Sequence, residues 1–366
     1  MRILQICSMY YDNTLFKHMF EAMEAQGMES VVYVPKWSDN KSENNVYIIS
    51  KRHNKLEKFL FWTEQEYILN DIETRIPIDT IDCIYAHRLL FGGHAALHLY
   101  KKYHIPYIVE ICNSDIYGFG RNIFRFKNHS TEIMENAKRI LFFSKTYMDY
   151  VLNKCVDRRY REGFQKKCEV LVSGIDQYFI DNTISIDSHS LPQEKQINIV
   201  FIGWIDKNKN LPTLIKACQD LLRRNYLVNL KVLGKIIENK IYQKAINHGF
   251  VEYLGFRSQN ELLNILRQSD VFVLPSIHES FGLVYAEAMT QGTPILYTRG
   301  QGFDGQYEDG EVGYSINCFD EREIADRILD VLSDFRNISN RCIVNSQRYR
   351  WDVIAKRYKE IINQCI

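Results

Sequence analysis

The chain has 366 residues, of which 46% are hydrophobic and 25% charged, and its formal net charge is +1. This length suits two domains, and the near-neutral charge argues against nucleic acid as a partner. No apolar run approaches the ~18–20 residues that a membrane-spanning helix needs. The 9 cysteines are scattered without a CxxC pair, which favours neither a disulfide framework nor a zinc site. We therefore expect a protein of the reducing cytoplasm.

The first half alternates short apolar runs with segments of helical periodicity, which predicts parallel strands joined through helices. Its opening run is too short for a signal peptide and lacks the small-residue cleavage pattern, so we expect a strand there. The strands expected in this half are Ile3–Ile6, Ser30–Val34, Cys83–Ala86, Tyr107–Ile111, Arg139–Ser144 and Glu169–Leu171.

Residues Lys51–Trp62 combine basic residues with a run of aromatic ones. Two interpretations stay open for this segment. It is either a solvated helix end that leads into a core helix, or a peripheral membrane contact with amines on headgroups and rings at the interface. A second basic stretch, Arg158–Arg161, is expected to be a plain surface loop.

The polar stretch Asp181–Gln196 predicts a linker, and a second alternation of strands and helices follows it. The strands expected in the second half are Ile197–Gly203, Leu230–Leu233, Val251–Leu254, Val271–Leu274 and Pro294–Tyr297. The final segment, Asp352–Tyr358, has the pattern of an amphipathic helix. The fold class is therefore α/β, in two halves.

The segment after the predicted strand Val271–Leu274 is the most informative part of the chain. There Glu279 and Glu287 bracket a glycine at the expected turn from strand to helix. Ligands of α/β folds bind at such strand ends, and the free N–H groups of Gly282–Val284 would attract an anion. A carboxylate such as Glu287 suits a sugar diol, because it accepts two hydroxyl hydrogen bonds. Recognition of phosphate and of a polyol together indicates a nucleotide sugar.

Other phosphate-binding motifs are absent from the sequence. Gly234-Lys235 is followed by Ile236, where a P-loop requires Ser or Thr, and no G-x-G-x-x-G follows the first strand. No DxD pair of aspartates occurs, so a metal-bridged diphosphate site of that type is not expected. The two glutamates would be ordinary solvated residues without their strand–turn–helix context, which favours the ligand-binding interpretation.

The segment Pro275–Glu287 resembles the E-x7-E signature of the retaining glycosyltransferases of family 4. Further segments resemble motifs of that family in the same order along nearly the whole chain. They are Ala86-His87, Pro106–Asp115, Val170–Asp176, Phe201–Ala217, Val251–Gly255, Glu308–Gly313 and Trp351–Tyr358. Each motif is weak evidence by itself, whereas the ordered set is specific.

This resemblance implies a GT-B fold, with two Rossmann-like domains whose parallel sheets face a central cleft. Residues 1–185 would form an N-terminal acceptor-side domain together with a crossing helix at 350–366, and residues 197–349 would bind the nucleotide sugar. The implied reaction is retaining transfer from a nucleotide-diphosphate sugar to a hydroxyl of a glycan or lipid-linked glycan, in polysaccharide or glycoconjugate synthesis. A UDP-sugar is the favoured donor and a GDP-sugar the second candidate. No cofactor or metal is implied, and the expected location is the cytoplasm or the inner membrane face.

The family's functional residues can be carried over residue by residue. Glu279, on the donor sugar, and Lys209, on the diphosphate, would be catalytic. The donor-binding positions would be Gly203, Trp204, Lys207, Phe281, Gly282, Leu283, Val284 and Glu287, the last on the ribose hydroxyls. The positions on the acceptor side or near the donor sugar would be Tyr11, Cys112, Asn113 and Asp115.

The chain also departs from the family pattern. Trp204 replaces an Arg that contacts the diphosphate, and Cys112-Asn113 replaces a His-Gly beside the donor sugar. Trp204 would either pack in the core or stack on the donor, and Cys112 is expected to be a small buried residue rather than a nucleophile. Two alternatives to a transferase stay open: a nucleotide-sugar epimerase of GT-B fold, and a non-catalytic partner subunit.

Overall fold

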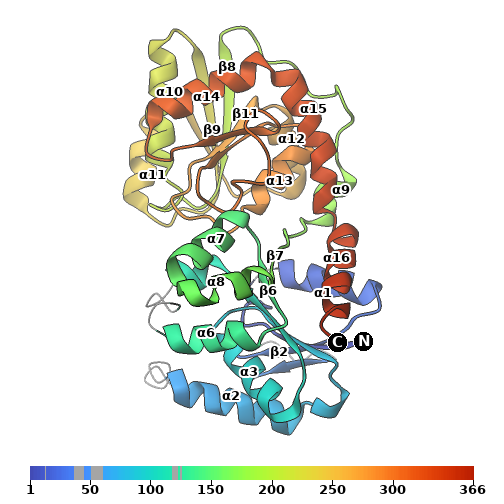
Figure 1. Cartoon of the computed structure of the whole chain (residues 1–366). Coiled ribbons are helices and arrows are strands. Elements are labelled where there is room, and N and C mark those ends of the chain that lie inside the picture. The colour runs from blue at the N-terminus through green and yellow to red at the C-terminus, as the bar shows by residue number, and fades with distance from the viewer. Residues whose placement is uncertain (13, 37–44, 51–60, 118–122, 124–125) are drawn as a thin grey trace. The chain divides into compact units, whose positions relative to one another are not determined.

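The computed structural model describes residues 1–12, 14–36, 45–50, 61–117, 123 and 126–366. The chain divides into two compact units (Figure 1). The first contains Met1–Phe143, Tyr147–Gly174 and Trp351–Ile366, and the second contains Ser144–Thr146 and Ile175–Arg350. None of the described helices has both the length and the hydropathy that crossing a membrane requires.

The first unit contains a seven-stranded parallel sheet with the strand order β3-β2-β1-β4-β5-β6-β7. The strands are β1 (Arg2–Ile6), β2 (Glu29–Val34), β3 (Val46–Ile48), β4 (Cys83–Ala86), β5 (Tyr107–Ile111), β6 (Arg139–Phe142) and β7 (Cys168–Val170). Strands β4 and β5 are buried along their whole length, which explains their continuous apolar runs. The direction of strand addition reverses between β1 and β4, so the loops after these two strands border the switch point of this sheet.

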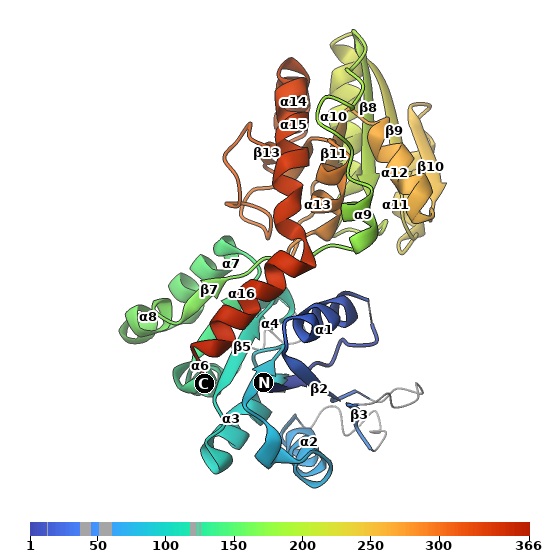
Figure 2. The ribbon, with the colours of Figure 1, turned by 90° about the vertical axis from the view of Figure 1, so that its right-hand side faces the viewer.

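Helices cover both faces of this sheet (Figure 2). Those of this half of the chain, with the last helix, are α1 (Leu15–Ala25), α2 (Phe61–Arg75), α3 (Phe91–Tyr103), α4 (Asn113–Tyr117), α6 (Lys127–Asn136), α7 (Lys145–Tyr150), α8 (Arg158–Gln165) and α16 (Trp351–Asn363). A 3-10 turn covers Ile78–Thr80 and a π turn Val151–Cys155. Helix α16 packs against α1, and a side chain at Gly174 would collide with the Trp351 ring at its start.

A chain of buried polar side chains lies under α16. The ring of His87 accepts or donates a hydrogen bond at 2.8 Å to Gln5, and the Tyr85 hydroxyl donates to Glu110 at 2.7 Å. The Tyr85 ring stacks on His87 with centroids 4.0 Å apart and lies 5.8 Å from that of Tyr358 in α16. These buried hydrogen bonds and ring contacts favour one position of the helix, although His87 Nδ1 has no hydrogen-bond partner among the described residues.

The second unit contains a six-stranded parallel sheet with the order β10-β9-β8-β11-β12-β13. The strands are β8 (Gln196–Ile202), β9 (Leu227–Leu233), β10 (Val251–Gly255), β11 (Val271–Leu274), β12 (Ile295–Thr298) and β13 (Gly313–Ile316). The helices are α9 (Gln177–Asp181), α10 (Leu211–Arg223), α11 (Asn239–Ile246), α12 (Gln259–Arg267), α13 (Leu283–Thr290), α14 (Glu321–Ser333) and α15 (Phe335–Ser346), followed by a 3-10 turn at Gln347–Tyr349. Here the switch point lies between β8 and β11.

Two predictions about local structure were wrong. The stretch Asp181–Gln196 belongs to the second unit, because the Asn182 carbonyl accepts from Arg267 at 3.1 Å and Ile184 donates to Thr290 at 3.1 Å. Polar composition alone did not reveal these long-range hydrogen bonds. The basic stretch after residue 157 forms α8 rather than a loop, since its amphipathic pattern buries Phe164.

Candidate functional site

The loops that follow β8 and β11 meet at the switch point of the second sheet. They bring Lys209 and Glu279 together, with Lys209 Nζ 2.5 Å from Glu279 Oε2. The Ser276 hydroxyl donates to the same carboxylate oxygen at 3.1 Å. The side chains of Lys209 and Glu279 are only 19% and 14% exposed, so little water screens this ion pair.

Asn208 joins the two loops through three hydrogen bonds. Its Nδ2 donates to the His278 carbonyl at 2.9 Å, and its Oδ1 accepts from the His278 N–H at 3.0 Å. Its own carbonyl accepts from the N–H of Ile277 at 2.7 Å. Asn208 was not predicted as a site residue. A single Asn between two lysines does not indicate that it binds a residue 70 positions away in the sequence.

The backbone of Glu279 is also fixed from a third loop. Its N–H donates to Gln301 Oε1 at 3.1 Å, and its carbonyl accepts from the N–H of Gly302 at 2.8 Å. On the opposite side, the N–H of Lys209 donates to Asp206 Oδ1 at 2.8 Å. Both members of the ion pair therefore sit on backbone that is held in place before any ligand arrives.

Helix α13 begins beside this pair. Gly282 adopts a left-handed conformation with φ of 80°, and a side chain there would collide with the ring of Tyr285, so the tight turn requires glycine. No side chain caps the helix, which leaves first-turn N–H groups at Leu283 and Val284 without intrahelical partners. Phe281 is buried and packs against Phe303, so its ring belongs to the core.

Glu287 occupies the second turn of α13. Its carboxyl makes no hydrogen bond or ion pair with the described part of the chain. Burial and, to a lesser extent, the negative charge of Asp176 raise its pKa to about 7. The carboxylate of Asp176 already has hydrogen-bond partners, because it accepts from the N–H of Tyr178 and from Gln259 Nε2, each at 2.9 Å. The acceptor capacity of Glu287 therefore remains for a ligand.

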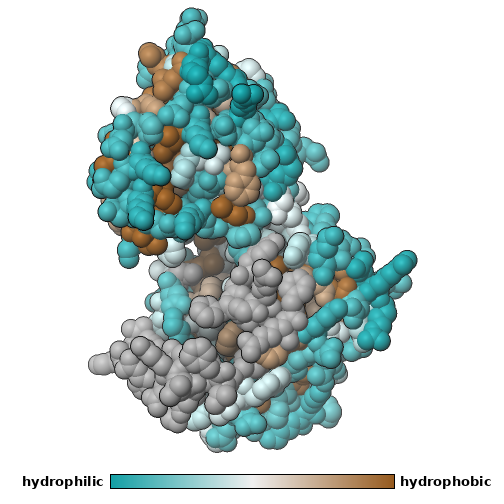
Figure 3. Space-filling view, turned by 90° about the vertical axis from the view of Figure 1, so that its left-hand side faces the viewer, coloured by the Kyte–Doolittle hydropathy of each residue, from teal (hydrophilic) through white to brown (hydrophobic). Residues whose placement is uncertain are grey.

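The other predicted donor-binding residues follow β8. Gly203 lies beside Leu274 and the stem of Lys209 at ordinary contact distances, whereas a side chain at Gly234 would collide with the Gly203 carbonyl. Trp204 is 60% exposed, so packing in the core is excluded and the stacking interpretation remains. Lys207 is 85% exposed, with Nζ 4.0 Å from Glu238. Figure 3 shows exposed apolar residues of the second unit as separate areas among hydrophilic ones.

The candidates in the first unit follow β5, except Tyr11, which contacts Tyr10 edge to face at 4.9 Å. Asp115 is buried and accepts from the N–H of Cys112 at 3.1 Å and from its Sγ at 3.2 Å. Burial, with the Asp115 charge, raises the pKa of Cys112 to about 12, so the thiol stays protonated at neutral pH. Asp115 thus holds the turn after β5, and Asn113 opens α4 beside it.

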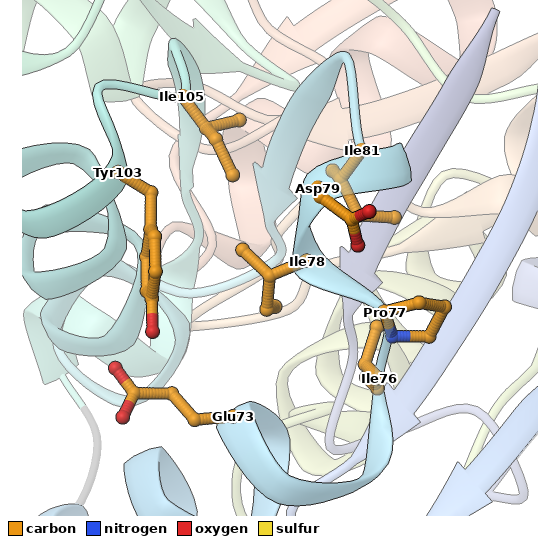
Figure 4. Close-up of a pocket in the computed structure, with 8 residues that line it drawn as sticks. All are labelled: Glu73, Ile76, Pro77, Ile78, Asp79, Ile81, Tyr103 and Ile105. Atoms are coloured by element: carbon orange, nitrogen blue, oxygen red, sulfur yellow. The ribbon is translucent and has the colours of Figure 1, made fainter.

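A pocket of the first unit lies at the amino ends of its strands, away from these loops (Figure 4). Isoleucines line its floor, and Glu73, Asp79 and Tyr103 supply its polar groups. Glu73 is already bound by Lys102 at 2.8 Å.

Of the basic-aromatic segment Lys51–Trp62, residues 51–60 lie outside the described residues. Trp62 is 49% exposed, and its ring lies 5.2 Å from His129 and 5.6 Å from His94, centroid to centroid. Within the described ranges, no group of His, Cys, Asp or Glu side chains could hold a metal ion.

Comparison with known proteins bears on this site. Residues 183–349 match the family model described as glycosyl transferases group 1. An uncharacterized glycosyltransferase of Methanocaldococcus jannaschii is 26% identical over an alignment of 340 residues, which covers 86% of this chain and 83% of that protein. The phosphatidyl-myo-inositol mannosyltransferase of Mycobacterium leprae is 27% identical over 57% of this chain and 59% of its own length.

Solved structures show the same fold over almost the whole chain. The sucrose-phosphate synthase of Thermosynechococcus elongatus has a TM-score of 0.74 at 17% identity and covers 99% of this chain and 98% of that one. HepE of Anabaena in complex with UDP has a TM-score of 0.70 at 14% identity and covers 99% and 100%. The predicted GT-B fold is therefore confirmed. Residues 183–349 match the group 1 glycosyltransferase model, and together with the relatives named glycosyltransferases this match supports a transferase enzyme.

Proposed function

We propose that this enzyme is a retaining, metal-independent glycosyltransferase. Its donor is a nucleotide-diphosphate sugar, with UDP favoured over GDP, and its acceptor is a hydroxyl of a glycan or lipid-linked glycan in polysaccharide or glycoconjugate synthesis. The observation that carries this proposal is the buried Lys209–Glu279 ion pair beside the uncapped start of α13. This place combines the amine of Lys209 and the free N–H groups of α13 with two carboxylates, Glu279 and Glu287.

Each group has a role in the proposed binding of the donor. Glu287 accepts the ribose hydroxyls, and the N–H groups of Leu283 and Val284 bind the diphosphate. Lys209 divides its charge between Glu279 and the diphosphate as negative charge develops on the leaving group, which lowers the barrier electrostatically. Glu279 binds hydroxyls of the sugar and so positions its anomeric carbon.

The proposed transfer needs no protein nucleophile. The bond between the anomeric carbon and the diphosphate oxygen breaks, and the diphosphate leaves with the electron pair. The acceptor oxygen bonds to that carbon on the same face and passes its proton to the departing phosphate. The anomeric configuration is therefore kept, and the charge is stabilised by Lys209 and α13 without a metal.

The comparisons support the choice of substrates. HepE, a structural neighbour, was solved with UDP and with UDP-glucose, which favours a UDP-sugar here. The mycobacterial relative is named for a phosphatidyl-myo-inositol acceptor, which favours a lipid-linked acceptor. A peripheral membrane contact through Lys51–Trp62 belongs to this proposal, since each basic residue near an anionic surface contributes about 1 kcal/mol.

A panel of nucleotide sugars, each incubated with and without neutral and lipid-linked glycan acceptors, tests the proposal. We expect nucleotide release from one UDP- or GDP-sugar that depends on an acceptor. Turnover of no nucleotide sugar, or its conversion to an isomer without acceptor, would contradict it. For the membrane contact, the protein should co-sediment with anionic but not with neutral liposomes. This binding should be lost when four basic residues become Gln: Lys51, Arg52, Lys55 and Lys58. Unchanged binding of that variant would contradict the proposed membrane contact.

A further inference from the structure

Arg88 directly follows His87 at the carboxyl end of β4, at the switch point of the first sheet. The residue is half-buried, and its Nε is fully buried without a hydrogen-bond partner. Its guanidinium makes no hydrogen bond or ion pair with any residue that the structure describes. Its neighbour is the Phe91 ring, whose centroid lies 5.5 Å from Cζ. A guanidinium carries five N–H donors, and leaving them unsatisfied away from water costs free energy.

The acidic residues near Arg88 do not neutralise it by contact. Asp115 gives its carboxylate to the backbone and thiol of Cys112, and burial raises its pKa although Arg88 lowers it. Glu110 accepts from the Tyr85 hydroxyl at 2.7 Å. Neither carboxylate forms an ion pair or hydrogen bond with Arg88, although the charge of Asp115 interacts with the guanidinium, so the N–H donors of Arg88 remain available.

The surroundings of Arg88 are suited to an anion. Helix α3 begins at Phe91 with no side-chain cap, so its positive end lies close to Arg88. The carbonyl of Arg88 accepts from the N–H of Gly93 at 3.0 Å, which fixes the backbone that carries the guanidinium. In open α/β sheets, ligands bind outside the carboxyl ends of the strands at the switch point, which is where Arg88 stands.

We propose that Arg88 binds a compact oxyanion on the acceptor, either a phosphate or a sugar carboxylate. This inference rests on the proposed function, because it names a chemical feature of the acceptor. Arg suits both anions, since its planar fork donates two parallel hydrogen bonds to a phosphate or carboxylate. The enzyme would then select acceptors that carry such a group next to the reacting sugar.

Matched acceptors test this selection and identify the anion. Three acceptors with the same sugar and alkyl chain are compared: a neutral alkyl glycoside, its phosphodiester-linked counterpart and its uronic acid. Wild type should turn over one of the two anionic acceptors at least tenfold better, in kcat/KM, than the neutral one. Arg88→Gln should abolish that preference, and Arg88→Lys should restore part of it. Arg158→Gln in α8, an exposed arginine of the same unit, is the matched control.

A binding measurement makes the test independent of turnover. With the nucleotide site saturated by the nucleotide that binds best, inorganic phosphate and glucuronate are titrated against wild type and Arg88→Gln. We expect millimolar binding of one of them to wild type, at least tenfold weaker in Arg88→Gln, and both proteins should keep the same melting temperature and nucleotide affinity. Equal kcat/KM for neutral and anionic acceptors, or anion binding that Arg88→Gln does not change, would overturn the proposal. Absence of nucleotide-sugar turnover with intact anion binding would instead contradict the proposed function.

Discussion

The two switch points of this molecule carry partly buried positive charges, one of them paired and the other not. In the second sheet, Lys209 forms a short ion pair with Glu279, and Asn208 ties their loops together. In the first sheet, Arg88 contacts the Phe91 ring but makes no hydrogen bond or ion pair with the described residues. The same topology thus supports one site that is complete in the free protein and one whose charge awaits a ligand.

The difference fits the demands on the two substrates. Catalysis on the donor requires groups fixed where negative charge will develop, and the ion pair supplies this preorganisation. Selection of an acceptor requires a group whose pairing changes when the right ligand binds. An unpaired, partly buried charge raises the affinity for an acceptor that carries the matching anion and lowers it for a neutral acceptor.

The largest effect is expected at the ion pair. Glu279→Gln should lower kcat/KM for the nucleotide sugar about 10²–10³-fold, the loss typical of one preorganised electrostatic contact. Affinity for the free nucleoside diphosphate should stay nearly intact, since the partner of Glu279 is the sugar. Lys209→Gln should lower both quantities. Calorimetry and initial rates separate the two variants, and equal losses of both quantities in Glu279→Gln would place that residue on the nucleotide.

The next effect concerns Glu287. Glu287→Gln should weaken nucleotide binding by about 1–3 kcal/mol, the range for a charged hydrogen bond. Because burial raises its pKa to about 7, its ionised fraction, and with it the affinity, should rise about tenfold from pH 6 to pH 8. Calorimetry over this range must include Glu287→Gln, since the nucleotide's phosphates titrate as well. A pH profile shared by both proteins would count against the assignment.

Glu287 should also cost stability in the free protein. A carboxyl whose pKa rises from 4.5 to about 7 on folding lowers the free energy of unfolding as pH increases through that window. Glu287→Gln should therefore gain about 1–3 kcal/mol of stability at pH 8 and little at pH 4. Denaturant unfolding at both pH values measures this gain, and equal gains would show that burial of the charge is not the cause.

A smaller effect is expected at Asn208. Asn208→Ala removes the side-chain bonds between the two loops and should lower kcat about tenfold through misplacement of Lys209 and Glu279. KM for the donor should change less, because the binding groups themselves remain. The exposed Asn247→Ala in α11's C-cap position is the matched control. A loss in melting temperature with unchanged kcat would reduce Asn208 to a structural role.

The smallest effect is expected from removal of metal. With the leaving charge stabilised by Lys209 and α13, activity in excess EDTA should stay within about twofold of its starting value. Initial rates before and after chelation measure this. Loss of activity that manganese or magnesium restores would require a metal in the mechanism.

Sequence predicted the local parts of this molecule better than the distant ones. Three strands have the predicted bounds: Cys83–Ala86, Tyr107–Ile111 and Val271–Leu274. Buried parallel strands consist of continuous apolar runs, which are visible in the sequence. The edge strands Val46–Ile48 and Gly313–Ile316 were missed, since strands of three and four residues are too short to show a periodicity.

The site divides in the same way. Glu279, Glu287 and the turn at Gly282 were found because they lie within one strand–turn–helix segment. The direct pairing of Lys209 with Glu279 was missed, since its partners are 70 residues apart in sequence. Arg88 was missed because an arginine after a strand is ordinary in sequence, and only the folded structure shows that it forms no hydrogen bond or ion pair with the described residues.

Product stereochemistry tests the central claim most directly. Proton NMR would follow the reaction of an α-configured nucleotide sugar with its acceptor from the first minutes, with Glu279→Gln as the low-activity reference. For a retaining transferase, we expect an α-linked product that forms only when acceptor is present. A β-linked product, or an isomerised nucleotide sugar without acceptor, would contradict it.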